Sequence, residues 1–327
     1  MSDHAAGPTL GYEPAPDWDG FIGAETSFAG DATAVAVNSR DQVFVFNRGP
    51  VPVIVFDPSG RVLDAWGAGE FTRPHSIRID RDDNVFLVES QGGHVIQKRS
   101  PGGELLMELG SRGKPSGPHS GAPFNSPTDI AIHRTTGDLF VSDGYGNSRI
   151  HRFDAQGNHL LSWGEPGGDP GQFYVPHSLA FIDDEHLVVC DRENFRLQIF
   201  TLDGVFVDQW HAFRPCAVTV SEVTGLLYVA ELGPAPAYHG LPDLGSRIRI
   251  LTPSGQRVGS MGARTPGHGR DQFMAPHSLA FDSSGALYVA EVSRTWADNY
   301  LRLKDEPTTE PISLQKWIQR GTKEDRA

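Results

Sequence analysis

Two nearly identical segments recur in the second half of this sequence: GQFYVPHSLAF at residues 171–181 and DQFMAPHSLAF at residues 271–281. A third segment, RPHSIRI at residues 73–79, begins in the same way. Aligned with three further segments, each shows an alternating apolar stretch, a polar turn and a second stretch of β-branched and aliphatic residues. Each segment therefore predicts a β-hairpin, and the six begin at Ala32, Pro74, Pro127, Pro176, Pro215 and Pro276.

Most of these hairpins continue into two more predicted strands. In NSRIHRFDAQGNHLLSWG, residues 147–164, the turn is expected at Asp154 to Gly157, because Asp and Gly suit tight turns. Four antiparallel strands repeated six times, without helical periodicity, predict an all-β chain folded as a six-bladed β-propeller. Two stacked β-sandwich domains are the alternative, but they do not explain why the first-strand motif occurs six times.

The predicted propeller covers residues 31–317. Residues 1–30 form an N-terminal segment that either pairs into the last blade or leaves residues 299–317 to complete that blade alone. The stretch ISLQKWIQR, residues 312–320, is expected to supply an outer strand, and residues 318–327 a charged tail.

Composition narrows the class of protein. The 327 residues include 37 glycines and 24 prolines spread along the chain, as expected for a fold with many turns. The formal net charge is -13 and no Lys/Arg cluster occurs, so nucleic acid is not expected as a partner. No signal peptide and no apolar stretch of membrane-spanning length is seen, which favours a cytoplasmic protein without a membrane partner. The two cysteines, Cys190 and Cys216, are too few for a disulfide framework.

Histidine recurs at one position of the aligned segments. The residue after the initial proline position is, in order, Thr33, His75, Thr128, His177, Cys216 and His277. In a ring of six blades, alternate blades are about 120° apart, so three histidines at the start of the innermost strand can converge on the central axis. Such a site suits zinc or another divalent transition metal with an open position for water or substrate. Cys216 is either a further ligand or a buried apolar residue, and Cys190 is expected in the core.

A second aligned position lies at the end of each second strand. Five of the six residues there are acids, and most are expected to accept hydrogen bonds from turn amides. The next residue is Arg48 in the first blade and Arg192 in the fourth, and both are expected at the mouth of the channel. An arginine there either binds a substrate carboxylate or pairs with the ring acids. Tyr145, in SDGYGNSR, could act as a base if it lies close to a dication. The six residues are Asn47, Glu89, Asp143, Asp191, Glu231 and Glu291.

With these residues in place, the sequence resembles the peptidyl-α-hydroxyglycine α-amidating lyase family, a branch of the NHL-repeat propellers. The resemblance rests on SDGYGNSRI, VPHSLA and DRENFR in that order, within residues 126–200, and extends more weakly over about residues 31–300. It implies a zinc ion held by His75, His177 and His277, a catalytic Tyr145, and catalytic, substrate-binding arginines at Arg48 and Arg192. The implied reaction splits an N-acyl α-hydroxyglycine into a primary amide and glyoxylate, and the implied partner is a small-molecule or peptide-like substrate with a carboxylate.

The sequence departs from that family in two respects. The family holds calcium with two backbone carbonyls and an aspartate after the third histidine; the carbonyl positions here are Val35 and Ile77, but the following residue is Ser278. Because calcium prefers charged oxygen ligands, this site is expected to be weak at most. Two of the family's disulfide positions are occupied by Gly146 and Ile199, as expected for a protein that is not exported.

Two other functions remain open from the sequence alone. A propeller hydrolase or lactonase would use the same metal to activate water. A non-catalytic NHL scaffold would bind a protein on its loop face, without metal. The sequence identifies neither the physiological substrate nor the oligomeric state.

Overall fold

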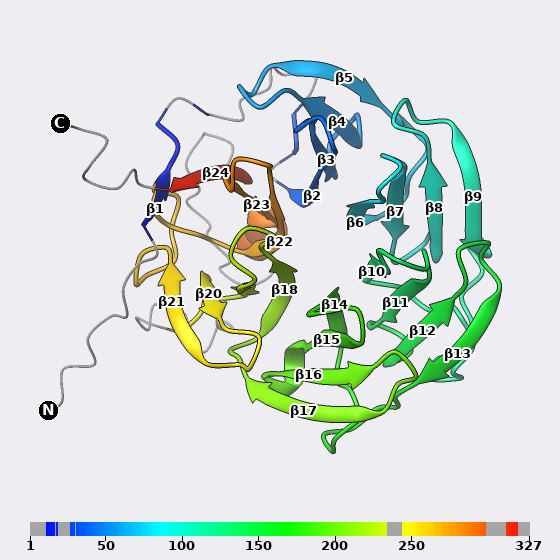
Figure 1. Cartoon of the computed structure of the whole chain (residues 1–327). Helices are drawn as coiled ribbons and strands as arrows, with labels where there is room; N and C mark the ends of the chain where they lie inside the picture. Colours follow the sequence, from blue (N-terminus) through cyan, green and yellow to red (C-terminus); the bar gives the residue numbers. More distant parts are fainter. Residues whose placement is uncertain are drawn as a thin grey trace, which may run out of the picture.

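The computed structural model describes residues 11–16, 18, 27–29, 31–233, 244–298 and 312–319. Six antiparallel sheets of four strands each surround a central channel (Figure 1). The predicted six-bladed β-propeller is therefore confirmed, and the alternative of two stacked sandwiches is wrong. No helix among the described residues is long and apolar enough to cross a membrane.

Each blade runs outward from a strand that lines the channel. The first three blades are β2 (Ala32–Val37), β3 (Val43–Asn47), β4 (Val53–Phe56) and β5 (Val62–Trp66); β6 (Pro74–Ile79), β7 (Val85–Glu89), β8 (Val95–Arg99) and β9 (Leu105–Gly110); and β10 (Asp129–Ile132), β11 (Leu139–Asp143), β12 (Arg149–Phe153) and β13 (His159–Trp163).

The fourth and fifth blades follow the same order. They are β14 (Pro176–Phe181), β15 (His186–Asp191), β16 (Arg196–Thr201) and β17 (Phe206–His211); and β18 (Pro215–Val220), β19 (Leu227–Glu231), β20 (Arg247–Leu251) and β21 (Arg257–Met261). Two short helical turns follow second strands: the 3-10 turn η2 (Arg192–Asn194) after β15, and α1 (Ser293–Trp296) after the corresponding strand of the sixth blade.

The sixth blade closes the ring with strands from both ends of the chain. It consists of β22 (Pro276–Phe281), β23 (Leu287–Glu291), β24 (Leu314–Gln319) and β1 (Tyr12–Pro14), in that order from the channel outward. Tyr12 pairs with Gln319, and its hydroxyl donates to the carbonyl of Gly285 at 2.9 Å. The stretch expected as an outer strand is thus the third strand, because the N-terminal strand adds to its free edge.

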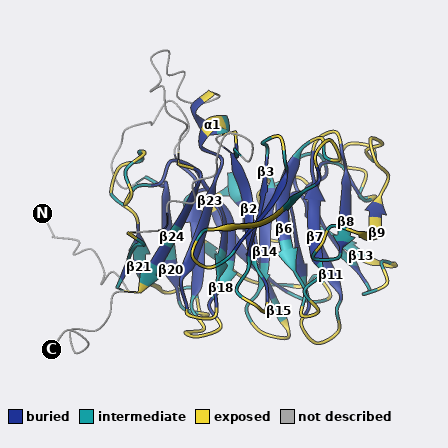
Figure 2. Ribbon diagram, turned by 90° about the horizontal axis from the view of Figure 1, so that it is seen from above, coloured by how far each residue is buried: buried dark blue, intermediate teal, exposed yellow. Residues whose placement is uncertain are grey.

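The core lies between neighbouring blades. Phe86 and Val88 of β7, for example, pack against Ile130 of β10 and Val141 of β11, and all four are at most 1% exposed. Buried residues concentrate in the inner strands, whereas the exposed ones gather in the loops and outer strands (Figure 2). Cys190 is fully buried in one of these inter-blade clusters, as predicted. This packing fixes the inner strands around the channel.

Turn chemistry joins the outer strands as the sequence predicts. The amide of Gly157 donates to the carbonyl of Asp154 at 3.0 Å, and a carboxylate oxygen of Asp154 accepts from the amides of Gln156 and Asn158. Gly157 has φ of 88°, a conformation that favours glycine. The turn therefore needs both of the residues that marked it in the sequence.

Candidate active site in the central channel

Bulges at the start of the innermost strands direct the three histidines. The pairing of β6 with β7 shifts between Pro74 and Ser76, and that of β22 with β23 shifts between Pro276 and Ser278. His75 and His277 are the residues left out of the pairing, and a longer shift in β14 includes His177. Because a bulge changes the direction of a side chain, all three imidazoles can face the axis of the channel.

The three imidazoles form a nearly equilateral cluster. Their ring centroids are separated by 5.0 Å between His75 and His177, 4.9 Å between His75 and His277, and 4.8 Å between His177 and His277. One ring nitrogen from each lies within 4.8 Å of the others, and all three side chains are buried. The structure thus brings together the histidines that the register of the repeats predicts.

Backbone carbonyls of the intervening blades orient these rings. The Nδ1 atoms of His75, His177 and His277 lie 2.6, 2.7 and 2.7 Å from the carbonyl oxygens of Thr128, Cys216 and Thr33, respectively. Since a carbonyl only accepts, each Nδ1 carries the proton, and the lone pair is on Nε2. The sequence placed the residues of the intervening blades in the same register but gave no sign of this role, because any residue has a carbonyl.

Burial keeps the three histidines neutral. It lowers the pKa of His75 and His177 well below the ordinary value, with further lowering by neighbouring histidines and by Arg48 or Arg192. Burial, followed by the charge of Arg48, lowers the pKa of His277 to about 3. Three neutral imidazoles with oriented rings are a donor set that suits a transition metal, and zinc in particular. The residues present therefore fit a metal of this kind.

Tyr145 lies against the histidine cluster. Its hydroxyl oxygen is 3.2 Å from Nε2 of His75 and 3.1 Å from Nε2 of His177. Arg192, the first residue of η2, places Nη1 3.4 Å from the same oxygen, and its guanidinium lies 5.5 Å from the centre of the tyrosine ring. The hydroxyl thus sits between two potential metal ligands and a cation.

Tyr145 and the two arginines occupy one equivalent position in their blades. The amides of Arg48, Tyr145 and Arg192 donate to the carbonyls of Asp31, Ser126 and Val175, which precede the first strands. The sequence alignment had placed Gly144, not Tyr145, at this position. The structure shows that one extra residue after Asp143 shifts the register, so a tyrosine reaches the channel where the other two blades present an arginine.

Arg48 is held at the mouth of the channel by two neighbours. Its Nη1 donates to Asp31 at 3.1 Å and to the hydroxyl of Thr295, in α1, at 2.7 Å. Its Nε is buried and has no partner among the described residues, and the pKa of Arg48 is lowered by burial. A buried N–H without a partner is costly, so this atom is a candidate donor to a ligand. Because Thr295 belongs to α1, the mouth opens on the α1 face of the disc (Figure 2).

Arg192 is paired with an acid that the sequence did not single out. Its Nε donates to Glu193 at 2.7 Å, and Arg214 donates to the same carboxylate. In the described part of the chain, Arg48 pairs with Asp31 and Arg192 with Glu193, and neither pairs with the ring acids, which was the alternative to substrate binding. Sequence reasoning missed Asp31, Glu193 and Thr295, because the loop and the two short helical turns that hold them carry no repeat signal.

The ring acids are structural, as expected. Their carboxylates accept from amides of the loop that leads into the first strand: Glu89 from Thr72, Asp143 from Asn125, Asp191 from Tyr174, Glu231 from Phe213 and Glu291 from Met274. Each acid therefore fixes a loop on the face where the channel opens.

The positions expected for calcium do not form such a site. Val35 and Ile77 lie on β2 and β6, but the hydroxyl of Ser278 accepts from the amide of Val35 at 3.2 Å and supplies no charge. The carboxylate that does line this part of the channel, Asp129, is paired with Arg78 at 2.5 Å. Calcium requires six to eight oxygen ligands, so these residues do not fit it.

Comparison with known proteins supports the relationship to the amidating lyases that the sequence motifs indicate. The NHL repeat model matches residues 124–153 and 173–200. The chain is 34% identical over 271 residues to peptidyl-glycine alpha-amidating monooxygenase A of Xenopus laevis, covering 78% of this chain and 28% of that protein. It is 31% identical over 288 residues to peptidyl-alpha-hydroxyglycine alpha-amidating lyase 1 of Drosophila melanogaster, covering 78% and 50%. It is 37% identical over 153 residues to the probable lyase pgal-1 of Caenorhabditis elegans, covering 46% and 43%.

Among solved structures, a streptogramin B lyase superposes with a TM-score of 0.59 and 12% identity, covering 94% of this chain and 98% of that one. At this identity the likeness concerns the fold alone. The chain spans between 28% and 50% of the length of the three curated relatives, and two of them align with 78% of it. On this basis the chain belongs to the peptidyl-α-hydroxyglycine α-amidating lyase family, among the NHL-repeat β-propellers.

Proposed function

We propose that this protein is a carbon–nitrogen lyase that cleaves an N-acyl α-hydroxyglycine, or a closely similar carbinolamide, to a primary amide and glyoxylate. The observation that carries the proposal is the position of the Tyr145 hydroxyl, within 3.4 Å of two histidine Nε2 atoms and of Nη1 of Arg192. A candidate proton acceptor, Tyr145, therefore lies next to a candidate set of metal ligands and to the positive charge of Arg192. Two partly buried arginines at the same mouth suit a small substrate with a carboxylate.

His75, His177 and His277 would hold the metal through Nε2, and we propose zinc because three neutral imidazoles with an open position suit it. When bound, zinc supplies Lewis-acid polarisation of an oxygen atom and stabilises negative charge there. The carbonyls that accept from Nδ1 keep the rings in place without any metal, so the site is preorganised.

The chain's own residues account for the remaining steps. Tyr145, in its deprotonated form, takes the proton of the substrate hydroxyl, while the nearby positive charge of Arg192 stabilises the phenolate. The electron pair of the O–H bond forms the C=O bond of glyoxylate as the C–N bond breaks. The amide nitrogen leaves with the electron pair of the C–N bond and receives a proton, which Tyr145 returns. Arg48 and Arg192 bind the carboxylate, which is unchanged in the product.

The test is a product assay with zinc-loaded protein and N-acetyl α-hydroxyglycine. A lyase releases acetamide and glyoxylate in equal amounts, faster than the uncatalysed breakdown in buffer. Release of acetate would indicate a hydrolase instead. No turnover of this or of related N-acyl α-hydroxyglycines, with metal bound, would refute the proposal and favour a binding scaffold.

A further inference from the structure

Below the histidines, the channel contains a second layer of polar residues. The residue after each channel histidine is a serine, and these alternate with Ala34, Asp129 and Ala217 of the intervening blades. The three serines, Ser76, Ser178 and Ser278, and Asp129 are all at most 5% exposed. One carboxylate therefore enters the axis of the channel from the third blade.

Four donors surround the Asp129 carboxylate. One oxygen accepts from the hydroxyl of Ser76 at 2.5 Å and from the amide of Ile130 at 2.9 Å. The other accepts from the hydroxyl of Ser178 at 2.7 Å and from Arg78 at 2.5 Å. Because each carboxylate oxygen already accepts from two donors, little capacity remains for a metal ion.

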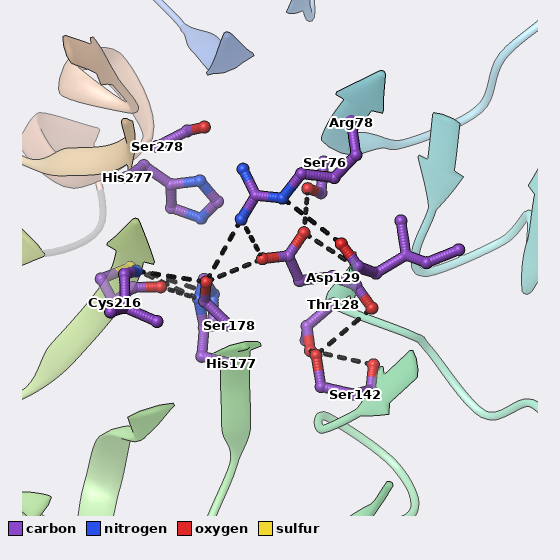
Figure 3. A network of polar contacts seen from close by, with 12 residues as sticks. Ser76, Arg78, Thr128, Asp129, Ser142, His177, Ser178, Cys216, His277 and Ser278 are labelled. Atoms are coloured by element: carbon purple, nitrogen blue, oxygen red, sulfur yellow. Dashed lines mark hydrogen bonds and ion pairs between the residues drawn. The ribbon is translucent and has the colours of Figure 1, made fainter. Parts of the chain in front are cut away.

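Arg78 reaches this carboxylate from the neighbouring second blade. It lies on β6, and its Nε donates to the carbonyl of Ile130 at 3.3 Å while Nη2 approaches the hydroxyl of Ser178 at 3.5 Å. Figure 3 shows the guanidinium between Asp129 and Ser178 on one side and His277 and Ser278 on the other. One side chain thus joins the second, third and fourth blades.

A small cavity lies against both this ion pair and the histidines. Its volume is about 10 Å³, room for roughly one water molecule, and its lining includes Arg78, Asp129 and the three channel histidines. The positive charge of this layer therefore comes from a residue of the chain itself, next to the place where the resemblance implies a calcium ion.

We propose that Arg78 is the resident cation of this layer, and that its ion pair with Asp129 replaces calcium as the cross-link beneath the metal centre. Three observations support it: Asp129 is fully paired, Ser278 supplies no charge at the expected ligand position, and Arg78 extends into the space between them. The inference concerns stability and cation binding, and it does not depend on the lyase reaction.

The first test uses the wild-type protein, freed of calcium on a chelating resin and reloaded with zinc. The proposal predicts no bound calcium by mass spectrometry and a change in Tm of less than about 1 °C on adding about 5 mM CaCl2. A calcium site of micromolar affinity would instead raise Tm by several degrees at that concentration. Calcium bound in stoichiometric amount, or such a rise in Tm, would overturn the proposal.

The second test separates charge from packing. Arg78→Met keeps most of the volume but leaves Asp129 as an unpaired buried charge, so Tm should fall by roughly 5–10 °C. Arg78→Met with Asp129→Asn removes both charges and should recover at least half of that loss. Arg61→Met, at a surface ion pair in which the arginine is 76% exposed, is the control and should leave Tm unchanged. If the single and double variants are equally stable, the ion pair has no such role; if Arg78→Met does not fold, the double variant still decides.

Discussion

The imidazole of His177 donates its Nδ1 proton to the backbone carbonyl of Cys216 at 2.7 Å. The thiol of Cys216 lies 3.5 Å from the same nitrogen, and burial raises its pKa to about 11, so it is a neutral thiol. The corresponding residues for the other two histidines are Thr128 and Thr33. We therefore expect this residue to contribute to the site through its carbonyl, and its side chain to be exchangeable.

Cys216→Thr should retain the metal. Threonine is the residue found at both equivalent positions, and the substitution keeps the carbonyl that orients His177. The check is zinc affinity by competition with a chromophoric chelator, where we expect the variant to lie within about threefold of wild type. A loss of more than about a hundredfold would show instead that the sulfur is a ligand.

Tyr145→Phe should lower kcat by about 10²- to 10⁴-fold, because it removes the proton acceptor and keeps the ring. Metal content and Tm should remain close to those of wild type, since the ring is kept and the hydroxyl contacts channel residues, His75, His177 and Arg192. Tyr174→Phe is a matched control, as Tyr174 is 59% exposed. If kcat for Tyr145→Phe stays within about threefold of wild type, the base is another group.

Arg192→Lys should lower kcat/KM by about 10- to 100-fold, because lysine keeps the charge but loses the planar fork that binds a carboxylate. The loss should be much smaller for the methyl ester of the same substrate, which lacks the charged carboxylate. Steady-state kinetics with acid and ester measure both. Equal losses for the two substrates would mean that Arg192 acts elsewhere, for example through Glu193.

How much of this site the sequence predicts depends on the kind of contact. The histidines were predictable because repeats place like residues at like positions, and Arg48 and Arg192 followed from the same alignment. The hydrogen-bond partners of those residues were not predictable, because Thr128 and Cys216 act through their backbone carbonyls and Asp31 lies in a loop. The pairing of Arg78 with Asp129 joins residues 51 positions apart in different blades, and no local pattern marks it.

The fold was predicted for similar reasons. The prediction was incomplete where the repeats give no information. Alternating strands and Asp/Gly turns recur in every blade, so the number of blades follows from the sequence. The way in which the ring closes does not follow from the sequence, because a three-residue strand such as β1 is too short to show a periodic pattern. Its pairing with β24 is decided by the free edge that the sixth blade offers.

Glu291 should make stability depend on pH. It is 1% exposed, and the contacts of the described residues include no cation for it; burial raises its pKa from 4.5 to about 7, despite three hydrogen bonds. Between these values the unfolded chain has lost the proton that the folded chain keeps, so the stability of the folded chain falls as pH rises. Glu291→Gln lacks this dependence. Its free energy of unfolding relative to wild type should therefore increase by up to about 3 kcal/mol as the pH rises from 4.5 to 7.

Urea unfolding of both proteins at pH 5 and pH 8 measures that gain. A difference in stability that is the same at both values would show that Glu291 is ionised throughout. Glu231→Gln is the contrasting variant, because the Glu231 carboxylate accepts from Arg249 at 2.9 Å. It should lose stability at both pH values, since the arginine is left without its partner.

The most direct test of the metal centre is the metal content of the protein after incubation with zinc and removal of the excess. The comparison is between wild type, His177→Ala and His159→Ala; His159 is exposed and lies outside the channel. The account predicts about one zinc ion per chain in wild type and in His159→Ala, and none in His177→Ala. Metal retained in His177→Ala, or none in wild type, would contradict it.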